Sequence, residues 1–147
     1  MHGLPIGKLV LCEYDDAWPC AYEAEAEQIQ RAVGAIVIDI QHIGSTAVPG
    51  LLAKPVIDIA LAVESADAVG RVAEALSSQG YEFRGPHEDP KHYYLIKNRD
   101  GLRLFHLHVW IVPDVGWDSH LRFRDRLRQS QALIARYAAK KRQWAET

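Results

Sequence analysis

The chain has 147 residues, of which 48% are hydrophobic and 24% are charged. This size and composition are typical of one globular domain with its own core, and they exclude disordered, collagen-like and disulfide-scaffold proteins. With 17 Lys and Arg against 19 Asp and Glu, the formal charge is -2. We therefore do not expect nucleic acid as a partner, although a local basic patch is compatible with this balance.

The first half of the chain predicts a strand, a helix and two further strands. Residues 8–13 form a short apolar strand candidate, and a helix with acidic residues at its start follows over 15–33. Isoleucines alternate with other residues over 36–41, which is the period of a strand. The run 56–63 is nearly all apolar, which is typical of a central strand covered on both faces.

The second half predicts another helix, a hairpin and a helical end. Ser65 is a good N-cap for the second helix. Strand-like segments at 92–97 and 102–112 flank an Asp-Gly pair, which is a strong hairpin signal. The rest is helical, with one helix capped by Asp118 or the serine after it and another restarting at Ser130.

No repeat, low-complexity tract or flexible linker interrupts the sequence. We therefore expect residues 1–147 to form one domain. The elements follow the rough order βαββαβββαα, which predicts an α+β fold with a mixed β-sheet and helices packed on it.

The cysteines and the apolar runs bear on the cellular compartment. Cys12 and Cys20 have no Cys-x-x-Cys spacing, so two free thiols in a reducing compartment are expected. Gly3 and Pro5 interrupt any secretory apolar region, and no run approaches the ~18 apolar residues of a membrane span. These features predict a cytoplasmic protein with no membrane partner.

The segment from His42 to Ile59 carries the most informative pattern. Gly44 and Ser45 follow a predicted strand, where backbone N–H groups and a hydroxyl could cradle a phosphate. Asp58 then interrupts an apolar strand, and a lone buried charge costs several kcal/mol unless it is paired or binds a cation. Asp58 is therefore expected either to bind a cation or to have a structural role, such as capping a loop or pairing with Lys54.

A second pattern is the pair His106 and His108. The two residues are two apart on a predicted strand and so share one face, as two ligands of one metal ion would. Imidazole pairs suit Zn, Mn or similar ions, but a site needs a third ligand, for which Asp58 is the candidate. The alternative is that both histidines are structural. The opposite face of this strand, from Phe105 to Ile111, is expected to be core.

A third pattern is the series Arg122, Arg124, Arg126 and Arg128. On a helix the pairs 122/126 and 124/128 each share a face and the two pairs diverge, so the arginines do not form one basic stripe. Because acidic residues lie among them, a solvated helix with salt bridges is the alternative to a ligand-binding role.

Four motifs, in this order, resemble the GrpB family, whose fold belongs to the nucleotidyltransferase superfamily. The resemblance covers most of the chain, and the second motif is the family's most specific signature. The motifs are 14–19, similar to the family's YDPxWP; 42–50 together with 54–59; 106–109; and 120–128, similar to HLxFRDYLR.

The resemblance implies a role for the 42–59 signature. In nucleotidyltransferases a Gly-Ser at a helix start holds the triphosphate of a nucleotide. Carboxylates on the next strand bind two divalent cations that align the attacking group and the leaving pyrophosphate. Gly44 and Ser45 match the first element, and Asp58 matches the first carboxylate.

The sequence departs from the superfamily pattern at the second carboxylate, where Ala60 stands. The resemblance implies that His106 and His108, on the strand of the superfamily's third carboxylate, supply replacement ligands for a divalent metal (Mg, Mn or Zn). A smaller departure is Gln41, where the family often has Glu.

These patterns predict a metal-dependent, nucleotidyltransferase-like protein that acts on or binds a small-molecule nucleotide, with an unknown acceptor. The alternatives are a catalytically inactive nucleotide-binding module and a metal-dependent phosphoester hydrolase. Asp58 is the predicted catalytic residue. The predicted metal ligands are Asp58, His106 and His108, and the predicted phosphate ligands are Gly44, Ser45, Thr46, Lys54, Arg124 and Arg128.

Overall fold

The computed structural model describes residues 1–87 and 89–146. Its helices are α1 (Ala17–Val33), α2 (Ala66–Ser77), α3 (Val115–Arg128) and α4 (Gln131–Glu146), with short 3-10 helices η1 (Gly34–Ile36) and η2 (Ser45–Ala47). Its strands are β1 (Leu4–Pro5), β2 (Asp39–Ile43), β3 (Ile57–Val63), β4 (Tyr81–His87), β5 (Asp89–Arg99) and β6 (Leu102–Ile111). No helix within these described ranges is long and apolar enough to cross a bilayer.

The strands form one mixed sheet in the order β2-β3-β6-β5-β4, with β1 paired to β6. Strands β3 and β6 are parallel, whereas the other pairs are antiparallel. This arrangement confirms the predicted α+β fold. In the register of the parallel pair, Asp58 lies beside His106 and Ala60 beside His108.

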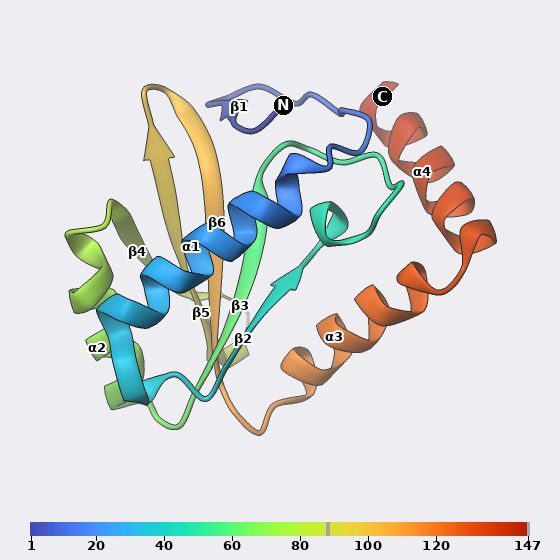
Figure 1. Ribbon diagram of the computed structural model, residues 1–147. Coiled ribbons are helices and arrows are strands. Elements are labelled where there is room, and N and C mark those ends of the chain that lie inside the picture. Colours follow the sequence, from blue (N-terminus) through green and yellow to red (C-terminus); the bar gives the residue numbers. More distant parts are fainter. Residues whose placement is uncertain (88, 147) are drawn as a thin grey trace.

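The two faces of the sheet carry different layers. Residues such as Ile59 and Leu107 pack with α1 and α2 in the main core. On the opposite face, the small side chains of Ala60 and Ala62 let Trp117 of α3 pack closely on the sheet. Figure 1 shows α1 crossing the sheet and α3 beside β2, with α4 following α3. The expected core face of β6 is confirmed, because Phe105, Leu107 and Val109 belong to the main core.

Several local predictions agree with the structure. Helix α1 covers most of the predicted helix, and Ser65 caps α2 by accepting a hydrogen bond from the backbone N–H of Ala68. The Asp-Gly hairpin joins β5 and β6, and both Asp100 and Gly101 have positive φ, as a tight hairpin turn requires.

Other boundaries differ from the predictions. Within 8–13 only Cys12 forms a bridge, to Ala53, and β1 lies earlier in the chain. Leu9 and Val10 are exposed, so their apolar character does not reflect burial in a sheet. Strand β4, which no predicted segment covered, is an edge strand with mostly exposed residues and therefore has no alternating pattern. Helix α3 begins earlier than predicted, because Asp114 caps it through the backbone N–H of Gly116.

Candidate functional site

The turn after β2 brings the predicted phosphate loop against Asp58. Gly44 has φ 74°, a conformation that residues with a Cβ rarely adopt. A Cβ at this position would also lie 2.7 Å from Oδ2 of Asp58. Gly44 is therefore required twice, by its backbone conformation and by the close approach of the carboxylate.

A pocket of about 80 Å³ lies beside this contact. It is much smaller than the ~300–1,000 Å³ of a site for a whole organic ligand, and its size suits a phosphate group. We call it the Ser45 pocket. Its lining residues are Ser45, Thr46, Lys54, Val56, Asp58, Arg103, His106 and Lys141. The fold thus brings together five residues of the predicted site, from η2, β3, β6 and the loop before β3.

Two cationic residues of the Ser45 pocket were not predicted from the sequence. Lys141 of α4 donates a hydrogen bond from Nζ to Oγ of Ser45. Burial, together with the nearby charge of Lys54, lowers the pKa of Lys141 to about 8. The Nε of Arg103 on β6 is buried and has no hydrogen-bond partner among the described residues. With Lys54, these side chains place three cationic groups around one carboxylate.

Asp58 contacts the two predicted metal-ligand histidines. Its Oδ1 lies 3.3 Å from Nε2 of His108 and 3.7 Å from Nδ1 of His106. The side chain of Asp58 is 31% exposed, so it is not the fully buried charge that the apolar strand suggested. Lys54 lines the same pocket, but none of the ion pairs found in the described part of the chain joins it to Asp58.

The donor types fit a zinc- or manganese-like ion. The two O–N separations are close to the ~3.3 Å edge of a tetrahedron with bonds of about 2.0 Å. However, no three His, Cys, Asp or Glu side chains in residues 1–87 and 89–146 are arranged as a metal site. The metal therefore stays a prediction. Asp58, His106 and His108 would hold it, and oxygens of a ligand would have to complete the coordination.

His92, on β5, extends this cluster. Its Nε2 lies 2.9 Å from Nδ1 of His108, whose Nε2 faces Asp58. The ring of His92 also stacks on Trp110, with centroids 4.1 Å apart. Burial lowers the pKa of His92 to about 4, and the neighbouring charge of His108 adds to this effect. A neutral His92 therefore fixes the orientation of the His108 ring.

The hydroxyl of Thr46 is used inside the protein. Its Oγ1 lies 2.9 Å from Nε2 of His42, and both residues are buried. The ring of His42 stacks on Tyr22 at 4.7 Å, and burial lowers the pKa of His42 to about 4. This contact secures η2 against β2, so Thr46, which lines the Ser45 pocket, also holds the turn in place through its side chain.

Arg124 and Arg128 share one face of α3, as predicted, and the structure places this face against β2 and η2. Arg124 donates to Oε1 of Gln41 at 2.8 Å and to the carbonyl of His42 at 3.0 Å. Arg128 donates to the carbonyl of Ala47 at 2.8 Å. Neither arginine lines the Ser45 pocket. Their contacts brace β2 and η2, and phosphate binding by these two residues stays a prediction.

Comparisons with known proteins place the chain in a family. The model of the GrpB protein family matches residues 8–147. The UPF0157 protein YqkA of Bacillus subtilis is 32% identical over 144 residues, which is 98% of this chain. The chain spans 42% of the length of that relative.

Solved structures agree with this relationship. The conserved protein GrpB from Enterococcus faecalis has a TM-score of 0.86 and 32% identity, over 93% of this chain and 83% of that one. The Cid1 poly(U) polymerase with MgGTP bound has a TM-score of 0.59 and 14% identity, over 83% of this chain and 41% of that one. The second likeness shows the nucleotidyltransferase fold alone. The chain belongs to the GrpB family and has a nucleotidyltransferase-like fold.

Proposed function

We propose that this protein binds the phosphate groups of a nucleoside triphosphate in the Ser45 pocket and acts as a nucleotidyltransferase-like protein. The observation that carries this proposal is the charge of the pocket. Lys54, Arg103 and Lys141 surround a phosphate-sized space whose remaining charged wall is Asp58. An excess of cations around a small space favours an anion with several charged oxygens.

Ser45 and Lys141 would both donate hydrogen bonds to the phosphate in this proposal. In the free protein, Nζ of Lys141 donates to Oγ of Ser45. A phosphate oxygen would accept from both groups and would offset the repulsion between Lys141 and Lys54 that contributes to the low pKa of Lys141. Arg103, whose guanidinium donates to the carbonyl of Lys8, would add positive charge to the pocket wall.

Asp58 would face the phosphates through a divalent cation. When bound, such an ion neutralises phosphate charge and aligns the attacking and leaving oxygens. Asp58 would hold it with His106 and His108, and His92 would orient the ring of His108. The likeness to Cid1, which was solved with MgGTP, supports a cation–triphosphate pair as the ligand.

A nucleotide-binding module without catalysis is the second candidate. Ala60 favours it, because this position beside His108 offers no carboxylate to a second cation. Turnover therefore separates the two candidates. Pyrophosphate released only with an acceptor indicates transfer, whereas binding with no turnover indicates the module. Release of phosphate without an acceptor would indicate the hydrolase instead.

Titration calorimetry with the four nucleoside triphosphates, in Mg²⁺ and in Mn²⁺, tests the proposal. Lys141→Gln should weaken binding about tenfold, because a hydrogen bond to a charged group is worth ~1.5–3 kcal/mol. Arg142→Gln, which removes an exposed charge from the same helix, is the matched control and should bind normally. Absence of triphosphate binding, or equal losses in both variants, would refute the proposal.

A further inference from the structure

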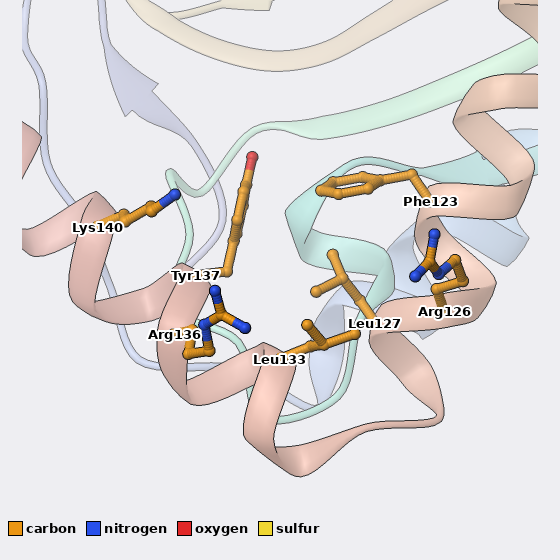
Figure 2. Close-up of a pocket in the computed structure, with 7 residues that line it drawn as sticks. All are labelled: Phe123, Arg126, Leu127, Leu133, Arg136, Tyr137 and Lys140. Carbon is orange, nitrogen blue, oxygen red and sulfur yellow. The ribbon is translucent and has the colours of Figure 1, made fainter.

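A second pocket lies between α3 and α4, and we call it the α3–α4 groove. It has a volume of about 240 Å³. Figure 2 shows Phe123 of α3 and Tyr137 of α4 facing each other across it, with Leu127 at the base. Three cationic side chains, Arg126, Arg136 and Lys140, complete its walls.

The cations of the groove lack anionic partners. Arg126, Arg136 and Lys140 form no ion pair with any other residue in the described part of the chain, and no acidic residue lines the groove. Three like charges around one cavity repel each other unless an anion lies between them. The groove therefore has the electrostatic character of an anion-binding surface.

The aromatic residues of the groove add a flat, apolar surface. Phe123 is 51% exposed, which is unusual for such a side chain. Its ring meets that of Tyr137 edge to face, with centroids 5.5 Å apart. Phe123 is thus exposed and Tyr137 is half-buried, and unpaired cations lie beside both rings. Accessible aromatic rings beside cations bind single-stranded nucleic acid, in which bases stack on the rings and phosphates contact the cations.

The near-neutral charge of the whole chain does not reveal the positive charge of α3 and α4. Helices α3 and α4 carry eight of the 17 basic residues and three of the 19 acidic residues. The remainder of the chain is correspondingly acidic. The near-neutral total, which argued against nucleic acid, thus results from two regions of opposite sign. Because the cations are spread over two helices, they can contact several phosphates of a polyanion, whereas a single phosphate would contact only some of them.

A third cavity lies between the groove and the Ser45 pocket. Phe123 and Tyr137 also line this cavity, which reaches Gly44 and Ser45. Tyr137 lies under Nζ of Lys141, which is 5.5 Å from its ring centroid. A strand held in the groove would therefore lie close to a triphosphate in the Ser45 pocket.

We propose that the α3–α4 groove binds a single-stranded nucleic acid without sequence preference. Its role as the acceptor rests on the proposed function, but its binding does not. Bases stack on Phe123 and Tyr137, and backbone phosphates contact Arg126, Arg136 and Lys140.

Fluorescence anisotropy with a fluorescein-labelled RNA of mixed sequence and about 12 nucleotides tests this proposal. The variant Arg126→Gln/Lys140→Gln should bind more weakly at low salt, and its log K against log salt should be shallower by about 1.4, or ~0.7 per lost phosphate contact. Phe123→Ala should weaken binding about tenfold with an unchanged salt slope, because it removes stacking alone. The control Arg31→Gln/Arg71→Gln removes two exposed charges from α1 and α2 and should match the wild type.

Each alternative has its own outcome. Absence of RNA binding at low salt, or equal losses in the groove and control variants, would overturn the proposal. Full displacement of the RNA by an equal concentration of a nucleoside monophosphate would also overturn it, because a single-nucleotide site would then suffice. Groove variants should keep the triphosphate affinity of the wild type. If RNA fails to bind while triphosphate binds, only this inference fails; if the reverse holds, only the proposed function fails.

Discussion

Charged side chains have different environments on the two faces of the sheet. On the α1–α2 face, Glu25 and Lys97 are each 8% exposed, 2.9 Å apart, and Tyr81 donates a further hydrogen bond to Glu25. On the α3 face, Asp58 is 31% exposed beside a pocket with excess positive charge. The first cluster is closed, because its charges are neutralised within the protein. The second is open to a ligand. Stability should therefore depend on the first cluster and binding on the second.

Breaking the closed cluster should have the largest effect on stability. Lys97→Ala leaves Glu25 buried without its counter-ion, which should cost about 3–5 kcal/mol of unfolding free energy. Urea denaturation measures this loss. The double variant Glu25→Leu/Lys97→Met should recover most of it, because no buried charge remains. A loss below about 1 kcal/mol for Lys97→Ala would mean that water reaches this pair and that the contrast between the faces is wrong.

The pH dependence of stability should report the buried histidine behind η2. The pKa of His42 is about 4 in the folded protein and 6.5 when exposed. Between these values the unfolded chain binds a proton that the folded chain does not, so His42 should lower stability by about 2.5 kcal/mol as the pH drops from about 6.5 to about 4. His92, whose pKa is also about 4, acts in the same direction.

His42→Asn should flatten this slope, as measured by denaturation at several pH values. Thr46→Val is the matched control, because it removes the hydrogen-bond partner and leaves the titrating ring in place. An equal slope in wild type and His42→Asn would assign the acid sensitivity to other groups.

Gly44→Ala should damage both stability and binding. The added Cβ meets Oδ2 of Asp58 and requires a φ that costs about 1–2 kcal/mol for an L residue. We expect a lower melting temperature and loss of triphosphate binding in calorimetry. Gly50→Ala, where φ is also positive but no atom lies within 4 Å, should lose less stability, through the φ cost alone, and keep binding. Loss of binding in both variants would remove the link to Asp58.

Asp58→Asn should have the smallest effect on stability and a complete effect on cation binding. The side chain keeps its shape, and the apo protein should stay within about 0.5 kcal/mol of the wild type. The increase in melting temperature on adding Mn²⁺ with a triphosphate should disappear. A clear drop in the stability of the apo variant would instead indicate that Asp58 has a structural role.

The sequence predicted β3 and β6 well because their signals are local, whereas the strand predicted at 36–41 begins only at Asp39, after η1. The apolar run around Asp58 and the alternation around His106 and His108 mark β3 and β6, and only the sheet register was needed to join them. Lys141 could not be identified in this way. It lies 96 residues from Ser45, among other basic residues of α4. Only the tertiary fold, which places α4 next to η2, brings Lys141 to the pocket. Arg103 likewise resembled an ordinary exposed residue of a hairpin.

The predicted phosphate ligands fall into two groups, which differ in what their side chains contact. Ser45 and Lys54 line the pocket, whereas Arg124 and Arg128 are held by backbone carbonyls of β2 and η2. A helical pattern can show that two arginines share a face, but it cannot show what that face meets.

The hydrogen bonds of Arg124 and Arg128 join α3, which lines the α3–α4 groove, to the backbone that forms the wall of the Ser45 pocket. A ligand that moves α3 would therefore also move the backbone of His42 and Ala47, which lie on either side of Gly44. Because such coupling is reciprocal, a strand in the groove and a triphosphate in the pocket would change each other's affinity by the same factor. The helices α3 and α4 would then couple the binding of two substrates, in addition to covering the sheet.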